Sequence, residues 1–301
     1  MAAKTSYFQV AGHVFGVAAS AGASSDDALF GNYRPFAVAE PDGAPLFVLE
    51  RVASLPSAEG EVVLRDVPAL PDMPRTVLRK NGPDWWVDMA PGAQMPCVLR
   101  LFVQDGFQRA LYAVRPGSDA WAKFALDNAL MLLFALASAA SDTLEIHASA
   151  VTLHGRGYAF LGPSGTGKST HSRLWLAHLP EAELLNDDNP VLRTVLDGAT
   201  YIYGTPWSGK TPCYRDASVP LGAVVLLAQA PRNAIRRLDP VEAYAALFSA
   251  ASGLKMQEPM ASDLHRTMER VVLQVPFYRL ECLPDVSAAA LCASTVMDGI
   301  K

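Results

Sequence analysis

Residues 1–116 alternate short apolar runs with pairs of turn-forming residues. Asp42-Gly43 precedes the run LFVLERV, Asn81-Gly82 separates RTVLRK from WWVDM, and Asp105-Gly106 separates VLRLFV from QRALYAV. Such pairs supply the positive φ angles of tight hairpins, and the prolines between the runs favour short or edge strands. The pattern predicts a β-rich N-terminal domain or lid over residues 1–116. It contains no catalytic motif, so we expect a β meander that serves as a cover or recognition module.

A strongly apolar segment follows this region. The pattern predicts a helix from Ser118 or Asp119 to Ser141, with either of the first two residues as the N-cap. Its most apolar part, residues 129–140, is about a dozen residues long, whereas a membrane span needs about 20. We therefore expect a buried core helix that connects two halves of the chain, over residues 117–143.

The remaining residues, 144–301, mix strand and helix patterns. Apolar runs predict strands at 144–153, 158–161, 183–186, 200–203, 222–228 and 276–282, and helices near 169–179, 241–251, 258–271 and 286–298. Asp239-Pro240-Val241-Glu242 is a typical helix start, with a capping side chain and a proline in the first turn. The expected fold class is mixed α/β.

One stretch of this last region matches the pattern G-x-x-x-x-G-K-[ST]. Its glycines allow backbone N–H groups to face a phosphate, and the helix that follows offers its positive end. Lys168 is expected to reach the β- and γ-phosphates, and the Ser169 hydroxyl to bind Mg²⁺. The predicted nucleotide-binding residues are Gly162, Pro163, Ser164, Gly165, Thr166, Gly167, Lys168, Ser169 and Thr170.

The strand that enters this loop has an unusual neighbour. Residues 148–153 also form an apolar run, and only four residues, His154 to Gly157, separate it from Tyr158. A connection this short permits a hairpin and excludes a helical crossover. The phosphate loop is therefore predicted at the end of an antiparallel pair of strands.

His147 before that hairpin, the loop GPSGTGKS, and Asp187-Asp188 after the next strand resemble the HPr kinase/phosphorylase family and, more distantly, PEP carboxykinases. The segment from Tyr203 to Lys210 (YGTPWSGK) looks like that of an HPr-kinase-related group of mostly unsettled function, some of whose relatives phosphorylate serine. The resemblance covers residues 144–230, extends to about 290 at most, and leaves out the N-terminal half. It implies a PEP carboxykinase/HPr kinase-like P-loop core over residues 144–301.

The resemblance also implies roles for individual residues. One of Asp187 and Asp188 acts as general base on an acceptor hydroxyl, and the other joins Ser169 in holding Mg²⁺ or Mn²⁺. His147 orients that base or shares its proton, and Lys168 holds the phosphates. A hydroxyl acceptor needs such a proton sink next to a metal-bound phosphate.

The chain departs from the family at two places. Tyr201-Ile202-Tyr203-Gly204 stands where HPr kinases have a metal-binding glutamate, so we expect Lys210 or Arg215 to place a cation near the phosphates instead. The basic C-terminal segment that docks HPr is also not evident.

Several of these residues also have a purely structural interpretation. Asp187 and Asp188 are of a type that often caps helices or ends strands in solvent, and an isolated histidine such as His147 is commonly a core residue. His171 and His178 are expected to pack or to face solvent.

Net charge and cysteine spacing exclude some classes of partner. The net charge of −5 disfavours a protein that grips nucleic acid, and the four cysteines include no C-x-x-C pair, which indicates a reducing compartment. The N-terminus does not have the pattern of a signal peptide. We expect a cytoplasmic protein with no nucleic-acid or membrane partner, and the sequence leaves open a homo-oligomer.

Together these patterns predict an ATP- and Mg²⁺-dependent kinase whose acceptor carries a serine-like hydroxyl, on a small molecule or a peptide. Two alternatives remain open. One is a PEP carboxykinase-like, ATP-dependent decarboxylase of oxaloacetate, although its lysine and histidine metal ligands cannot be located. The other is a non-catalytic, nucleotide-binding regulator, which the replaced glutamate favours.

Overall fold

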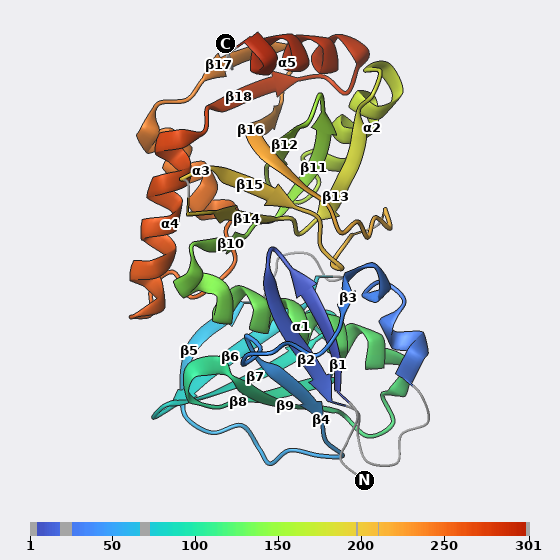
Figure 1. The fold of residues 1–301 in the computed structure, drawn as a ribbon, viewed down its shortest axis with the longest axis vertical. Coiled ribbons are helices and arrows are strands. Elements are labelled where there is room, and N and C mark those ends of the chain that lie inside the picture. The colour runs from blue at the N-terminus through green and yellow to red at the C-terminus, as the bar shows by residue number, and fades with distance from the viewer. Residues whose placement is uncertain (1–4, 19–25, 67–72, 197, 210, 299–301) are drawn as a thin grey trace. The chain divides into compact units, whose positions relative to one another are not determined.

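The computed structural model describes residues 5–18, 26–66, 73–196, 198–209 and 211–298. The chain divides into two compact units, Met1–Ala137 (the N-terminal unit) and Ser138–Lys301 (the C-terminal unit). Each contains a large sheet with helices, so the mixed α/β class is confirmed (Figure 1). The segment expected as a separate connector, residues 117–143, contributes its long helix to the N-terminal unit.

The N-terminal unit is built on a nine-stranded sheet in the order β3-β1-β2-β4-β9-β8-β7-β6-β5. The part from β5 to β9 is the expected meander of antiparallel neighbours. The strands are β1 (Thr5–Val10), β2 (His13–Ala18), β3 (Ala37–Val38), β4 (Val48–Arg51), β5 (Glu61–Asp66), β6 (Arg75–Asn81), β7 (Asp84–Ala90), β8 (Leu99–Val103) and β9 (Arg109–Val114).

Two of the three predicted turns join hairpins. Gly82, with a φ of 58°, turns β6 into β7, and Gly106, with a φ of 74°, lies between β8 and β9. The prediction for Asp42-Gly43 was wrong. The strands on either side of it are not neighbours, because β3 pairs with β1 whereas β4 pairs with β2 and β9.

The predicted apolar helix from Ser118 or Asp119 to Ser141 is confirmed. Helical backbone runs from Asp119 to Ser141, with α1 proper at Ala122–Ser138, and by length and composition this span could cross a membrane. The inference that this segment is too short to span a membrane was therefore wrong. Leu130 and Leu133 are nevertheless fully buried, and the ring of Phe134 packs edge-on against Phe15 of β2. These contacts identify α1 as a core helix of the N-terminal unit.

The C-terminal unit contains the second nine-stranded sheet. Seven strands follow the order β10-β14-β15-β16-β12-β11-β13, while β18 pairs with β16 and β17 pairs with β18. The strands are β10 (Thr143–Glu145), β11 (Ala148–Leu153), β12 (Arg156–Leu161), β13 (Glu183–Asp188), β14 (Val191–Thr194), β15 (Thr200–Tyr203), β16 (Ser218–Gln229), β17 (Ala234–Arg237) and β18 (Phe277–Cys282). The helices are α2 (Lys168–His178), α3 (Pro240–Ala250), α4 (Met260–Gln274) and α5 (Val286–Asp298).

The predicted hairpin before the phosphate loop is confirmed. Strands β11 and β12 are antiparallel and joined by His154 and Gly155, whose φ angles of 50° and 72° suit a two-residue turn. The predicted strand at 144–153 is divided in two, because the chain leaves the ladder at Ile146 and His147 between β10 and β11.

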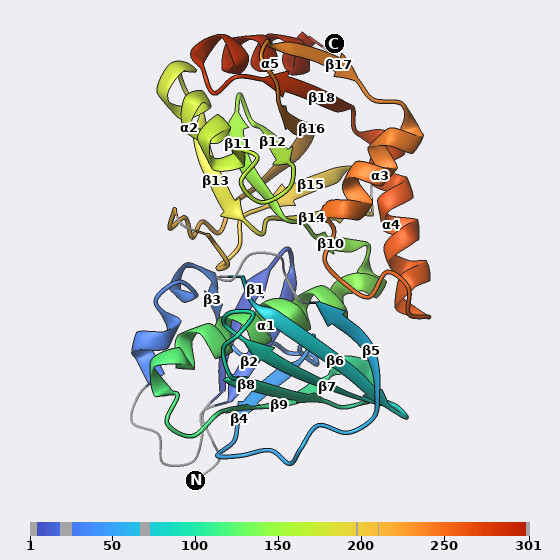
Figure 2. The same cartoon turned by 180° about the vertical axis from the view of Figure 1, so that it is seen from behind.

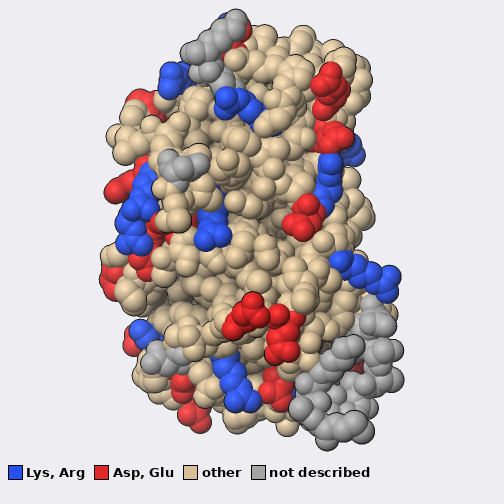
Figure 3. Space-filling view, in the orientation of Figure 1, with Lys and Arg blue, Asp and Glu red and all other residues tan. Residues whose placement is uncertain are grey.

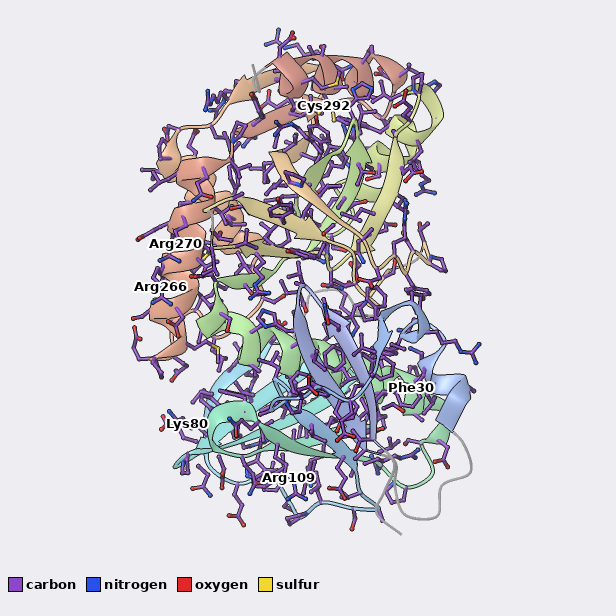
Figure 4. All side chains as sticks on the ribbon, viewed as in Figure 1. Phe30, Lys80, Arg109, Arg266, Arg270 and Cys292 are labelled. Carbon is purple, nitrogen blue, oxygen red and sulfur yellow. The ribbon has the colours of Figure 1, made fainter. Side chains whose placement is uncertain are left out.

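Helices cover both faces of this sheet (Figures 1 and 2). Helices α2 and α5 pack on one face around a core that includes Phe160, Trp175, Val225 and Cys292. Cys292, labelled in Figure 4, lies on α5. Helices α3 and α4 pack against one another and against the other side of the sheet.

Strand direction places several chain segments at one edge of the sheet. Strands β12, β16 and β18 are mutually parallel, and β13 also runs their way because both it and β12 are antiparallel to β11. The carboxyl ends of these four strands, and the start of β11, therefore lie along the same edge. Open α/β sheets bind ligands at this edge.

Charged side chains of both signs are interspersed on the face that Figure 3 shows. Many are paired within the C-terminal unit. Arg270, labelled in Figure 4, donates to Asp142 at 2.6 Å, and Arg266, one turn earlier on α4, donates to Asp263 at 2.6 Å. These exposed pairs each contribute little to stability.

Candidate active site

The phosphate-loop segment connects β12 to α2. Gly162, Gly165 and Gly167 have φ angles of 149°, 81° and 108°, in the range that L side chains rarely adopt. A Cβ at Gly162 would lie 3.2 Å from Thr166, whereas one at Gly165 or Gly167 would meet no atom within 4 Å. The glycines therefore set the shape of the loop, and the space over its second half is open.

Lys168, the first residue of α2, points back across the loop. Its side chain is buried, and its Nζ donates to the Gly162 carbonyl at 2.8 Å and lies 2.9 Å from His147 Nε2. Burial lowers the pKa of Lys168, while the carboxylates of Asp188 and Asp187 act in the opposite direction. The ammonium group is thus held between the loop and the acidic end of β13.

His147 connects this lysine to Asp188. Its Nδ1 lies 3.2 Å from Asp188 Oδ1, and the two side chains are 44% and 36% exposed. Because Lys168 is a donor, Nε2 of a neutral His147 accepts, so Nδ1 carries the proton and donates to the carboxylate. Three of the predicted residues therefore form one chain of polar contacts.

The backbone around Asp188 is fixed by a residue that sequence reasoning missed. Asn186 is fully buried, and its Oδ1 accepts from the Asp188 and Asn189 N–H groups at 3.0 and 2.9 Å. Its Nδ2 donates to Thr205 Oγ1 and to the Trp207 carbonyl, both at 3.0 Å. A run of Asn and Asp at a strand end signals such local hydrogen bonding, but not its distant partners.

The two adjacent aspartates are placed differently. Successive side chains of a strand point to opposite faces, so Asp187 does not share the environment of Asp188. Asp187 is only 5% exposed, and its carbonyl accepts from Gly209 N at 2.7 Å. By contrast, Asp188 faces His147 and accepts from Asn189 Nδ2 at 3.0 Å.

The predicted metal ligands are Ser169, Asp187 and Asp188. Among the described residues, no group of three or more His, Cys, Asp or Glu side chains is arranged to hold a metal ion. The residues present do fit Mg²⁺ bound together with a nucleotide, because that ion typically uses one or two protein ligands, phosphate oxygens and waters. The predicted residue Lys210 lies outside the described residues. Ser208, two positions earlier in the chain, forms a β-bridge with Asp188.

Arg215 does not supply the expected cation near the loop. Its guanidinium donates to Glu183 at 2.6 Å and to the Leu184 carbonyl at 2.9 Å, at the start of β13, whereas Asp188 ends that strand. The prediction for Arg215 was therefore wrong.

His171 packs in the core, which is one of the two roles predicted for it. It is buried, its Nε2 accepts from Trp175 Nε1 at 3.1 Å, and burial lowers its pKa to about 4. His178 is exposed at the end of α2.

A buried acid near the site was also missed. Glu145, at the end of β10, accepts at Oε1 from Ser252 Oγ at 3.1 Å, while its Oε2 has no hydrogen-bond partner among the described residues. Burial raises the pKa of Glu145 to about 8, and the charge of Asp188 acts in the same direction. The sequence gives no signal of this, because Ser252 lies more than a hundred residues away.

Comparisons with known proteins add little to this geometry. No family model and no curated protein matches the chain. Among solved structures, the HPr(Ser) kinase/phosphatase from Coxiella burnetii is similar with a TM-score of 0.31 and 13% sequence identity, over 52% of this chain and 95% of that chain. We draw no functional conclusion from so distant a similarity.

Proposed function

We propose that this protein is an ATP-dependent kinase with an HPr kinase-like P-loop core, which transfers the γ-phosphoryl group to a serine-like hydroxyl on a small molecule or a peptide. The observation that carries this proposal is the contact chain from Lys168 through His147 to Asp188, at 2.9 and 3.2 Å. It brings a phosphate-binding ammonium and a proton-accepting carboxylate to one place.

In this proposal, the nucleotide is held by residues 162–170. The N–H groups of the loop and of the first turn of α2 bind the phosphate oxygens, and Lys168 supplies a positive charge at the β- and γ-phosphates. The Ser169 hydroxyl and the Asp187 carboxylate would hold Mg²⁺ or Mn²⁺, which would neutralise further phosphate charge.

Asp188 acts as the general base. It removes the proton of the acceptor hydroxyl as that oxygen forms its bond to the γ-phosphorus, and ADP leaves with the electrons of the broken P–O bond. His147 and Asn189 hold the carboxylate in place by hydrogen bonds. The residual exposure of Asp188 gives an acceptor access to it.

The test is transfer of radiolabelled γ-phosphate from ATP to a panel of free serine, other small hydroxyl compounds and serine-containing peptides. We expect the wild-type protein to label at least one acceptor, and Asp188→Asn to lower kcat by at least 100-fold while ADP affinity stays within threefold. Asp187→Asn is the matched variant. We expect it to weaken Mg²⁺ binding, and so to raise the Mg²⁺ concentration that transfer needs, while the general base Asp188 remains. Binding of ADP without transfer to any hydroxyl compound would contradict the proposal.

One observation keeps a second candidate in view. Where the resemblance expects a metal-binding glutamate, β15 carries Tyr201, Ile202 and Tyr203, which favours a nucleotide-binding regulator without turnover. ATP affinity unchanged by Asp188→Asn, with no labelled product, would support it. Release of carbon dioxide from oxaloacetate in the presence of ATP and a divalent metal would instead support the carboxykinase-like reaction. We further propose that the protein acts in the cytoplasm, where ATP is available.

A further inference from the structure

We infer that the base and ribose of the nucleotide bind in a pocket of about 680 Å³ between the first turns of α2 and the segment after β18. We call it the α2–β18 pocket. It is lined by Thr170 and Leu174 of α2, by Pro231 after β16, and by Cys282, Leu283 and Pro284 at the end of β18. This inference rests on the proposed function, since it concerns the same nucleotide.

The order of the strands gives the nucleotide a direction. The carboxyl ends of four strands and the start of β11 lie along one edge of the sheet. Neighbouring strands along this edge come in the spatial order β13, β11, β12, β16 and β18. Asp188 ends β13 and His147 precedes β11, so both lie on one side of the loop that follows β12. The α2–β18 pocket lies on the opposite side, at the ends of β16 and β18.

The direction of Lys168 supports the same assignment. Its Nζ turns toward His147 and the start of the loop, which marks the end of the site where the terminal phosphate binds. Gly167 and Thr170, around the start of α2, line the pocket. A triphosphate bound along the loop therefore has its first phosphate, and the nucleoside attached to it, at the mouth of the pocket.

The chemistry of the lining suits a nucleobase. None of its residues is Asp, Glu, Lys or Arg, and most of the side chains are apolar. Its polar groups are partly committed, because Gln229 Nε2 donates to the Gly165 carbonyl at 3.3 Å and His171 accepts from Trp175. A flat aromatic ligand with apolar faces can be buried here without leaving a charge unpaired, and the volume is typical of small-molecule sites.

A second pocket, of about 770 Å³, shares part of the loop but lies on the α3 face of the sheet. Its lining is charged, with Arg236, Glu242 and Arg279, and it contains no residue of α2. Arg236 and Glu242 already bind each other through two contacts of 2.7 Å. The α2–β18 pocket therefore fits a nucleoside better.

The test compares the binding of Mg²⁺–ATP with that of Mg²⁺–inorganic triphosphate by calorimetry. Leu283 is 40% exposed and lies outside the helices and strands, so Leu283→Asp places a charge in the pocket without opening the core. We expect it to weaken ATP binding at least tenfold and inorganic triphosphate binding less than twofold. The matched control is Leu273→Asp on α4, where the leucine is 78% exposed and lines neither pocket, and it should change neither affinity.

Three results would overturn the inference. In the first, Leu283→Asp leaves ATP affinity unchanged, or weakens both ligands equally. In the second, Arg279→Ala weakens ATP selectively, which would place the nucleoside in the pocket on the α3 face. In the third, the wild-type protein binds neither ligand, which would contradict the proposed function itself rather than the pocket alone.

Discussion

At the scale of single residues, burial separates side chains that the sequence presents as equals. Asp187 and Asp188 are adjacent and identical in type, yet only Asp188 contacts His147. The sequence could predict that an acid would lie near the loop, because the strand and the loop end at one edge. It could not predict which one, because the choice depends on the strand's register and on Asn186 contacts to residues 205 and 207.

Lys168 provides the first prediction at this scale. Replacing it with methionine removes the positive charge but keeps most of the buried volume, so the free energy of unfolding should change by less than about 1 kcal/mol. The affinity for ATP should fall at least tenfold, because the phosphates lose a charge-assisted donor. Calorimetric titration and thermal unfolding measure the two effects. A variant that keeps wild-type ATP affinity would show that Lys168 does not contact the phosphates.

Glu145 provides a prediction about pH. Its pKa in the folded protein is about 8, above the ordinary value of 4.5, so the folded state holds its proton more tightly than the unfolded state does. The associated stability is present below pH 4.5 and is lost as pH rises to 8. Glu145→Gln should therefore become more stable than wild type over this range, by on the order of 4 kcal/mol at pH 8.

Denaturant unfolding at pH 5 and pH 8 measures this difference. Glu269→Gln, at an exposed position on α4, serves as the control and should follow the wild-type profile. If Glu145→Gln also follows that profile, Glu145 does not ionise with a raised pKa in the folded protein.

At the scale of elements, local patterns predicted most of the C-terminal unit. The hairpin of β11 and β12 followed from a connection of four residues, and the start of α3 from its capping residues. Strands β14 (VLRT) and β17 (AIRR) were missed because they are four residues long and partly polar. Their pairing partners, not their own composition, hold them in the sheet.

The start of α3 carries a stability prediction. Asp239 accepts from the N–H groups of Val241 and Glu242, both at 2.9 Å, and the Glu242 side chain accepts from the Asp239 N–H in return. Asp239→Ala removes this cap and should lower the free energy of unfolding by about 1 kcal/mol. ATP affinity should not change. Asp216→Ala, at another exposed acid, should alter stability by less than about 0.5 kcal/mol. Equal effects of the two variants would show that the cap does not stabilise α3.

At the scale of the whole molecule, every described residue of the candidate site belongs to the C-terminal unit. The sequence predicted this, because the only motif lies there. It could not predict what the N-terminal unit does, because a meander of short strands carries no chemical pattern, and the choice of acceptor therefore stays a proposal. Helix α1 shows the same limit, since only its packing distinguishes a core helix from a membrane span.

Because the described site residues belong to the C-terminal unit, a bound nucleotide should protect backbone amides of that unit from hydrogen exchange. Mg²⁺–ATP should slow exchange in peptides that cover residues 162–172 and 281–285, because the loop amides become hydrogen-bonded and the α2–β18 pocket fills. Peptides from strands β6 to β9 should be unchanged. Protection confined to the N-terminal unit would place the nucleotide elsewhere.

The most direct measurement is a crystal structure of the protein with Mg²⁺ and a non-hydrolysable ATP analogue. The account predicts that the terminal phosphorus lies beside Lys168 Nζ with the Asp188 carboxylate facing it, near enough to receive the proton of an attacking hydroxyl. A terminal phosphate that points away from β13, with Asp187 and Asp188 both out of reach, would contradict the phosphotransfer assignment even if the loop held the other phosphates.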